Sequence, residues 1–217
     1  MPKCIVEFIG SALLLAVVTG SGIMGDTLSA GNAAVALLGN SIATGCGLYV
    51  LIIILGPISG AHINPAVSLM FWQAGSLTTA ELIAYLIAQF AGAVAGVWLT
   101  HLMFAQAIVQ VSSHARSGFA MWVSELVSTL ILLSVIRIGV KQASEHVPTL
   151  VAMTVTAGYW FTSSTFFANP AVALARGFTD TFVGIRPADV MGFVSAELVA
   201  VTIVCLYAKV MNAQAVK

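Results

Sequence analysis

Charged residues are scarce in this chain. Of its 217 residues, 8 are Lys or Arg and 8 are Asp or Glu, so the formal net charge is +0. The charged share of 7% lies far below the roughly 25% that is usual in soluble domains. So few charges cannot cover the surface of a soluble protein, which excludes a soluble enzyme and a disordered chain. A chain without excess positive charge also lacks the electrostatic footprint of a nucleic-acid binder.

Hydrophobic residues take the place of the missing charges. They make up 59% of the chain, and the mean hydropathy is +1.03, which indicates an integral, multi-pass, all-α membrane protein. Long stretches between charges mark the expected membrane-spanning helices. We place six of them, at residues 4–24, 33–56, 80–103, 119–140, 148–163 and 188–209.

Cysteine is also rare. Cys4, Cys46 and Cys205 all lie in apolar segments, so they are expected as small core residues and not as a disulfide framework. No metal site and no cofactor are expected. The first apolar run contains Glu7 and is interpreted as a membrane span, not as a cleavable signal peptide.

Two apolar stretches are too short to cross a bilayer. Ile63–Trp72 follows a break at Gly56–Gly60, and Pro170–Phe178 follows the fifth expected span. A helix needs about 20 apolar residues to cross. These half-length pieces therefore predict re-entrant segments that line a cavity or lie buried in protein.

The two halves of the chain repeat one pattern. Residues 1–110 carry Glu7, then Asn64-Pro65-Ala66, then Gln89; residues 111–217 carry Glu125, then Asn169-Pro170-Ala171, then Glu197. Each half contains three expected spans, an odd number, so the copies insert with opposite topology. The sequence therefore predicts one domain, 1–217, built as an inverted repeat.

Charges at the ends of the spans predict orientation. Five cationic residues fall on the side of the termini and two on the other, which favours cytoplasmic termini by the positive-inside rule. The five are Lys3, Arg137, Lys141, Lys209 and Lys217, and the two are Arg116 and Arg186.

The Asn-Pro pairs predict the chemistry of a pore. Asn caps free N–H groups at a helix start, and Pro fits the first helical position. Opposite topology brings both helix starts together near the bilayer midplane, where their positive dipole ends oppose cations. Each Asn amide can still donate to a passing oxygen. This arrangement suits small neutral polar solutes.

These features resemble the aquaporin (major intrinsic protein) family over essentially the whole chain. Residues 59–66, which end in Asn64-Pro65-Ala66, match that family's first signature, and Glu7 and Glu125 match its buried glutamates. The resemblance implies six spans with two re-entrant half-helices, one pore per subunit and a homotetramer. Residues 169–182 also resemble bacterial aquaglyceroporin-like channels associated with arsenic resistance, which implies a bacterial plasma membrane and transport of arsenite or methylated arsenicals.

The resemblance also implies a selectivity filter of four residues. Counted from the two asparagines, its positions fall on Thr44, Ala157, Phe166 and Val172. The family's filter Arg is replaced by Val172, which removes a fixed positive charge and several donors. We expect a wider, more apolar constriction with broad specificity for glycerol-like solutes, arsenite and some water.

Several residues near the pore leave alternatives open. Arg176 either reaches back toward the filter or attracts anions in the outer vestibule, or it pairs with Asp180 or caps loop carbonyls. His62 either packs the re-entrant loop or acts as a pH gate. Glu7 and Glu125 either hold the re-entrant loops or relay protons, and Glu197 is expected to bond the second half-helix.

Three functions compete at this point. A passive channel for small neutral solutes is the main prediction, with a water-selective pore as its variant. A proton- or ion-coupled transporter is disfavoured, because the expected pore positions carry no carboxylate. An enzyme is not expected, because no nucleophile–base pair or metal cluster is evident.

Overall fold

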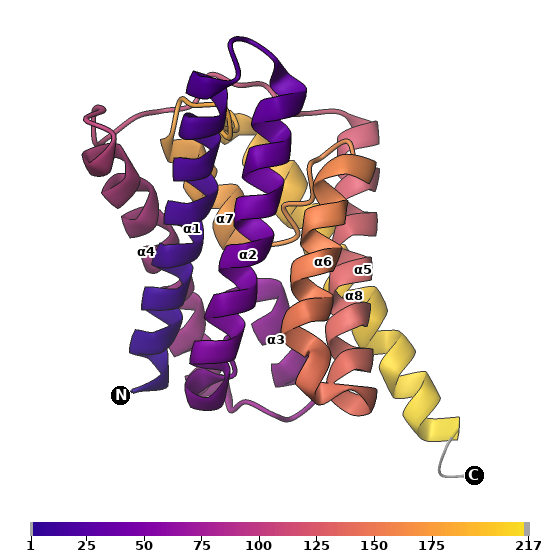
Figure 1. The fold of residues 1–217 in the computed structure, drawn as a ribbon. Helices are drawn as coiled ribbons and strands as arrows, with labels where there is room; N and C mark the ends of the chain where they lie inside the picture. The colour runs from indigo at the N-terminus through magenta and orange to yellow at the C-terminus, as the bar shows by residue number, and fades with distance from the viewer. Residues whose placement is uncertain (1, 215–217) are drawn as a thin grey trace.

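Eight α-helices form the bundle in the computed structural model, which describes residues 2–214 (Figure 1). Short 3-10 turns, Ser144–His146 and Arg176–Phe178, flank two of the helices. No strand occurs within residues 2–214. The helices are α1 (Lys3–Leu28), α2 (Ala33–Ser59), α3 (Pro65–Gln73), α4 (Thr79–Met103), α5 (Phe119–Gln142), α6 (Val147–Phe161), α7 (Pro170–Ala175) and α8 (Pro187–Gln214).

Helices α1, α2, α4, α5 and α8 are long and apolar enough to cross a membrane. Helix α6 is the sixth expected span and has 15 residues, about 22 Å at 1.5 Å per residue. Large apolar side chains such as Ile54, Ile87 and Leu206 lie exposed on the outside of the bundle, where lipid would cover them. The predicted all-α membrane architecture is confirmed.

Local sequence sets the ends of the helices. The Asn32 side chain accepts the backbone N–H groups of Ala34 and Val35 and so begins α2. Thr78 and Glu81 form a capping box that begins α4. Helix α2 ends at Ser59, and the next residue, Gly60, has a φ of +89°, which suits glycine.

The predicted break at Gly56–Gly60 is narrower than expected. Helix α2 runs on through Pro57 to Ser59, and only Gly60 leaves the helix. Proline lacks an N–H group and is disfavoured in a helix interior. A helix can nevertheless continue through a proline when the flanking turns are held in place. The second short helix is also shorter than predicted, because α7 stops at Ala175 and a 3-10 turn continues to Phe178.

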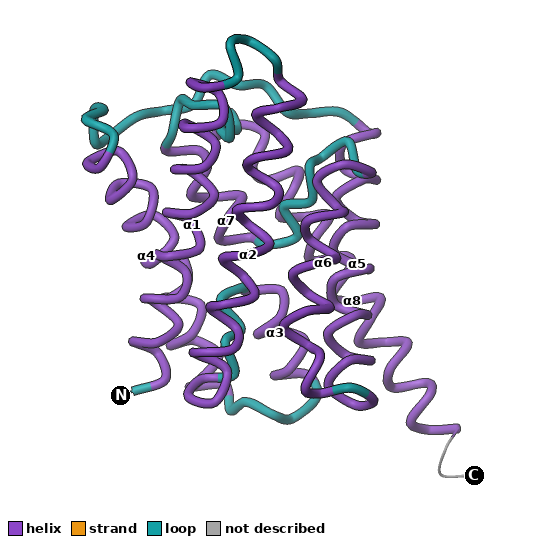
Figure 2. Tube along the Cα trace, in the orientation of Figure 1, coloured by secondary structure: helices purple, strands orange, loops and turns teal. Residues whose placement is uncertain are grey.

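The repeat is visible in the arrangement of the elements. Helices α1–α4 and α5–α8 each comprise two long helices, a short one and a last long one. Extended segments lead into α3 and α7 from opposite ends of the bundle and meet inside it (Figure 2). The start of α1 and the end of α8 lie at the same end of the molecule (Figure 1). Lys217, one of the charges used to predict orientation, lies outside the described residues.

Candidate pore and its lining

The two Asn-Pro-Ala motifs begin the two short helices in the same way. The side-chain oxygen of Asn64 accepts the N–H of Ala66 at 2.8 Å. The side-chain oxygen of Asn169 accepts the N–H of Ala171 at 3.0 Å and that of Val172 at 3.3 Å. Pro65 and Pro170 each occupy the first helical position. Both motifs therefore act as the helix starts that the sequence predicted.

The side-chain amides of the two asparagines tie the half-helices together. Asn64 Nδ2 donates to the carbonyl of Ala168 at 2.7 Å, and Asn169 Nδ2 donates to the carbonyl of Ile63 at 3.0 Å. Each bond joins one asparagine to the residue just before the other, so the contact obeys the symmetry of the repeat. An amide nitrogen carries two hydrogens, which leaves one on each asparagine for another acceptor.

The segments before the asparagines have a matched and unusual backbone. Ala61 and Ile63 have φ values of +46° and +40°, and their counterparts Phe166 and Ala168 have +56° and +46°. Residues other than glycine seldom adopt this left-handed conformation, because Cβ crowds the backbone. Surrounding contacts must hold it.

Glu7 holds the first of these segments. Its carboxylate accepts the N–H of His62 at 3.0 Å, the N–H of Ile63 at 2.6 Å and the hydroxyl of Ser59 at 2.7 Å. Gln89 Nε2 donates to the same carboxylate at 2.8 Å. Every partner of Glu7 is therefore a donor, and the loop-holding interpretation is the one that these contacts favour.

Two carboxyl groups hold the second segment. Glu125 accepts the N–H of Ala168, and Glu197 accepts the N–H of Asn169 at 2.8 Å. Both side chains are fully buried. The expected bond between Glu197 and the second half-helix is confirmed.

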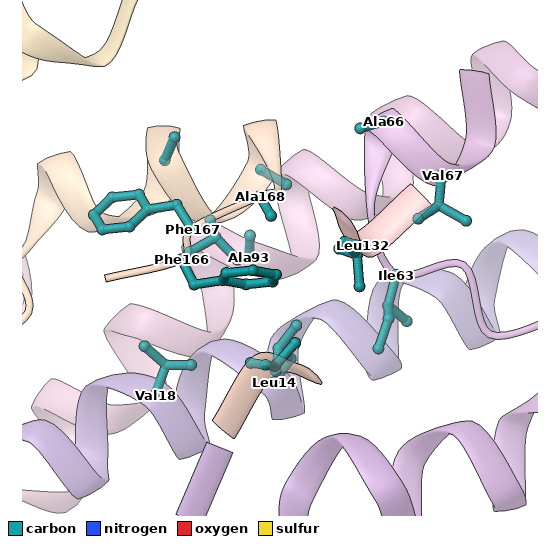
Figure 3. Packing of buried hydrophobic residues seen from close by; sticks show 14 of the residues in the cluster. Leu14, Val18, Ile63, Ala66, Val67, Ala93, Leu132, Phe166, Phe167 and Ala168 are labelled. Carbon is teal, nitrogen blue, oxygen red and sulfur yellow. The ribbon is translucent and has the colours of Figure 1, made fainter. Parts of the chain in front are cut away.

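A cavity of about 120 Å³ runs past both asparagines. That is several times the roughly 10–15 Å³ needed to hold one water molecule. Most of its wall is apolar and comes from residues four apart on α1, α2, α5 and α6, which face the same way on a helix. Figure 3 shows some of these side chains, with Ile63 and Phe166 of the two loops close to Leu14, Val18 and Leu132. The helical lining is Leu14 and Val18; Thr44, Leu48 and Ile52; Leu132, Ile136 and Val140; and Val147, Val151, Val155 and Tyr159.

Three of the four predicted filter residues line this cavity. They are Thr44, Phe166 and Val172. The placement of Ala157 is wrong, because its side chain faces outward and Tyr159 lines the cavity in its place. Residues two apart on a helix point in nearly opposite directions, so counting back from Asn169 selected the wrong face of α6.

Tyr159 changes the character of this end of the cavity. Its hydroxyl lies 3.2 Å from the hydroxyl of Thr44, and both residues line the cavity. The stripe Val147, Val151, Val155 at spacing four would have pointed to Tyr159 as its next member. This part of the cavity wall thus holds two aromatic rings and a pair of hydroxyls, where Thr44, Ala157 and Val172 predicted three small residues.

Arg176 turns toward the pore and not toward Asp180. It is 2% exposed, lines the cavity and donates Nε to the carbonyl of Val183. Its guanidinium lies 3.6 Å from the ring centre of Phe167. Asp180 instead accepts the N–H and hydroxyl of Ser113, at 2.8 and 2.9 Å. The hydrogen bond from the Ser113 N–H, and next that from its hydroxyl, lower the pKa of Asp180, so it stays ionised at neutral pH.

His62 is fixed by its neighbours. Nδ1 lies 3.1 Å from the Ser68 hydroxyl, and the ring stacks on Phe71 at 4.7 Å and meets the edge of Tyr85 at 5.4 Å. These contacts favour the loop-packing interpretation over a mobile gate, although the ring also lines the cavity.

Comparison with known proteins agrees with this architecture. The family model for the major intrinsic proteins matches residues 1–199. Among curated proteins, the aquaglyceroporin AqpS of Rhizobium meliloti is 55% identical over 196 residues, which cover 90% of this chain and 84% of that protein. The glycerol uptake facilitator protein of Pseudomonas aeruginosa is 32% identical over 108 residues, covering 50% of this chain and 38% of that one.

A solved structure shares the fold. The X-ray structure of the aquaglyceroporin from Plasmodium falciparum superposes with a TM-score of 0.74, at 20% identity, over 94% of this chain and 93% of that one. The paired half-helices, the inverted repeat and the family match over residues 1–199 together lead to one conclusion. The chain belongs to the major intrinsic protein family.

Proposed function

We propose that this protein is a passive transmembrane channel for small neutral polar solutes. The observation that carries the proposal is the pairing of Asn64 and Asn169 beside one apolar cavity, each with an amide hydrogen left to donate. A solute with hydroxyl groups replaces its lost water contacts there while its carbon skeleton lies against the aliphatic walls.

Charge selection follows from the same geometry. The start of α3 and the start of α7 face each other, and their N–H groups present positive partial charge. A cation entering this region loses hydration and gains no carboxylate, since none lines the cavity among residues 2–214. Glu7, Glu125 and Glu197 lie behind the loops with 0% exposure. The proposed channel therefore excludes cations and hydrated protons.

Breadth of substrate is proposed from Val172. A valine at this position leaves room and removes the charge that a filter arginine would supply. The name of the relative AqpS, aquaglyceroporin, supports glycerol-like solutes. Arsenite, a neutral hydroxide at physiological pH, and methylated arsenicals are proposed as further solutes, and some water is expected to pass.

Two other functions give different outcomes. Tyr159 and Arg176 make the constriction more polar than valine alone, which is the feature that favours a water-selective pore. A coupled transporter requires a group that exchanges protons within the solute pathway. In the described part of the chain, the ionisable groups that line the cavity are His62, Tyr159 and Arg176.

Solute flux into proteoliposomes separates these functions. Stopped-flow rates for water, glycerol, urea and arsenite are measured with and without an imposed proton gradient. The proposal predicts glycerol and arsenite fluxes well above those of empty vesicles and independent of the gradient. Water flux alone would establish the water-selective pore, and accumulation driven by protons would establish a coupled transporter.

The proposed setting is a bacterial plasma membrane, with cytoplasmic termini and four subunits per assembly. The cationic residues Lys3 at the start of α1, Arg137 and Lys141 near the end of α5, and Lys209 near the end of α8 support the orientation. Native mass spectrometry of the detergent-solubilised protein tests the tetramer. A monomer as the main species would contradict it.

A further inference from the structure

Two arginines gather at the end of the cavity opposite the chain termini. The guanidinium of Arg176 lies 3.6 Å from the ring centre of Phe167, and that of Arg116 lies 5.7 Å from the same centre. Arg116 comes from the loop before α5 and Arg176 from the turn after α7. Both positive charges therefore lie close to one aromatic ring.

Neither guanidinium has a carboxylate partner in the part of the chain that the structure describes. Among residues 2–214 the ion pairs are Lys3–Glu81, His114–Asp180 and Arg186–Asp189. Arg116 Nε donates to the carbonyl of Gly184 at 3.1 Å, and its Nη1 lies 3.4 Å from the hydroxyl of Thr165. The acidic residues nearby are committed elsewhere, Asp180 to Ser113 and Asp189 to Arg186 and the backbone N–H of Arg116.

Arg176 lines the cavity and keeps free donors. Its Nε donates to Val183, while its two terminal amino groups make no hydrogen bond within the described part of the chain. The residue is buried in protein and still lines the passage. A guanidinium with two open amino groups is a planar fork that matches the oxygens of a carboxylate, phosphate or similar anion.

We propose that Arg176, reinforced by the charge of Arg116, forms a binding site for a small oxyanion at this mouth of the pore. The expected effect of this site on flux rests on the proposed channel function. A bound oxyanion occupies the passage beside Val172 and slows the passage of neutral solutes. Arg176 thus restores fixed positive charge to this end of the pore from one turn beyond the usual filter position.

Inorganic phosphate is the probe. Phosphate binding to the purified full-length protein in detergent is measured by calorimetry at constant ionic strength. Chloride is the comparison anion, because a spherical ion cannot accept the paired hydrogen bonds of a planar guanidinium. We expect phosphate to bind and chloride not to compete at equal concentration. Arg176→Gln removes the fork and should weaken phosphate binding roughly tenfold or more. Arg116→Gln removes only a neighbouring charge and should weaken it about threefold.

Arg186→Gln is the matched control. Arg186 lies in the loop before α8 on the same side of the molecule, is paired with Asp189 and does not line the cavity. Its loss changes the net charge equally but should leave phosphate binding as in the wild type. Equal weakening by Arg186→Gln, or unaltered binding in Arg176→Gln, would overturn the proposal.

Flux provides the second readout. External phosphate should slow glycerol entry into wild-type proteoliposomes, and each variant is compared with its own rate without phosphate. If Arg176→Gln does not fold, two other variants carry the test. They are Arg116→Gln and Arg176→Lys, and the lysine keeps a charge but loses the planar fork. Phosphate binding that depends on Arg176 in a protein without glycerol flux would refute the channel function and leave the anion site standing.

Discussion

At the scale of single residues, Glu197 and Gln89 occupy matching places in the two repeats. Gln89 Nε2 donates to Glu7 at 2.8 Å and to the Ser68 hydroxyl at 2.9 Å. Glu125 and Glu197 accept the N–H groups of adjacent residues, Ala168 and Asn169, and each has one buried oxygen without a partner in the described chain. A carboxyl donates only when protonated, so one shared proton would do what the amide hydrogen of Gln89 does.

Replacing Glu197 tests this equivalence. Glu197→Gln supplies a permanent donor to Glu125 and keeps an acceptor for the Asn169 N–H, so its thermal stability should match the wild type. Glu197→Leu leaves the buried Asn169 N–H without its acceptor and should cost about 1–3 kcal/mol. Thermal unfolding in detergent measures both. A glutamine variant as unstable as the leucine variant would show that the charge of Glu197 is needed.

At the scale of elements, close contact between α1 and α4 depends on two glycines. A Cβ on Gly92 would overlap the carbonyl oxygen of Phe8, and one on Gly96 would overlap that of Ala12. Small residues four apart permit such backbone contact between membrane helices. This contact positions Glu7 on α1 beside Gln89 on α4.

Gly96→Ala should force the two helices apart. Overpacking of this kind costs about 1–3 kcal/mol, and here the obstacle is backbone, which cannot rotate away. Gly39→Ala on α2 is the control, because no atom of the described residues lies within 4 Å of the place its methyl group would take, and alanine favours helix. Thermal unfolding should show Gly96→Ala clearly less stable and Gly39→Ala unchanged or slightly more stable. Equal stability of the two variants would contradict the packing account.

Elements with a strong local signal were predictable from the sequence. Asn64-Pro65 and Asn169-Pro170 encode helix starts. Glu7 and Glu125, at matching places in the two repeats, were predictable as the residues that hold the re-entrant loops. Features decided by three-dimensional packing were not. Whether α2 continues through Pro57 depends on the elements packed around it. Whether Ala157 or Tyr159 lines the cavity depends on how α6 is rotated about its axis.

Arg176 illustrates the same limit. Spacing in the sequence made Asp180, four residues on, a plausible partner. The chain leaves the helix after Ala175, and Ser113 from a distant loop takes the carboxylate of Asp180. Long-range loop contacts of this kind leave no local pattern.

At the scale of the whole molecule, the inverted repeat makes one passage from two halves that are each incomplete. Each half supplies one asparagine, one short helix and half of the wall, and the amides of Asn64 and Asn169 join them. Seven residues after the motif asparagine the first half carries Phe71 and the second half carries Arg176, and Arg176 lines the passage with Val172 and Tyr159 at the end opposite the termini. Selectivity is therefore expected to reside at that end.

The ratio of glycerol to water permeability in Val172→Arg tests this account most directly. Arginine narrows the passage and adds a second charge near Arg176, so glycerol permeability should fall roughly tenfold while water falls less. Val172→Leu, which narrows the passage without charge, separates size from electrostatics. Stopped-flow light scattering on matched proteoliposomes gives the ratio. A lower glycerol-to-water ratio in Val172→Arg is the predicted result, and an unchanged ratio would contradict the placement of selectivity at Val172.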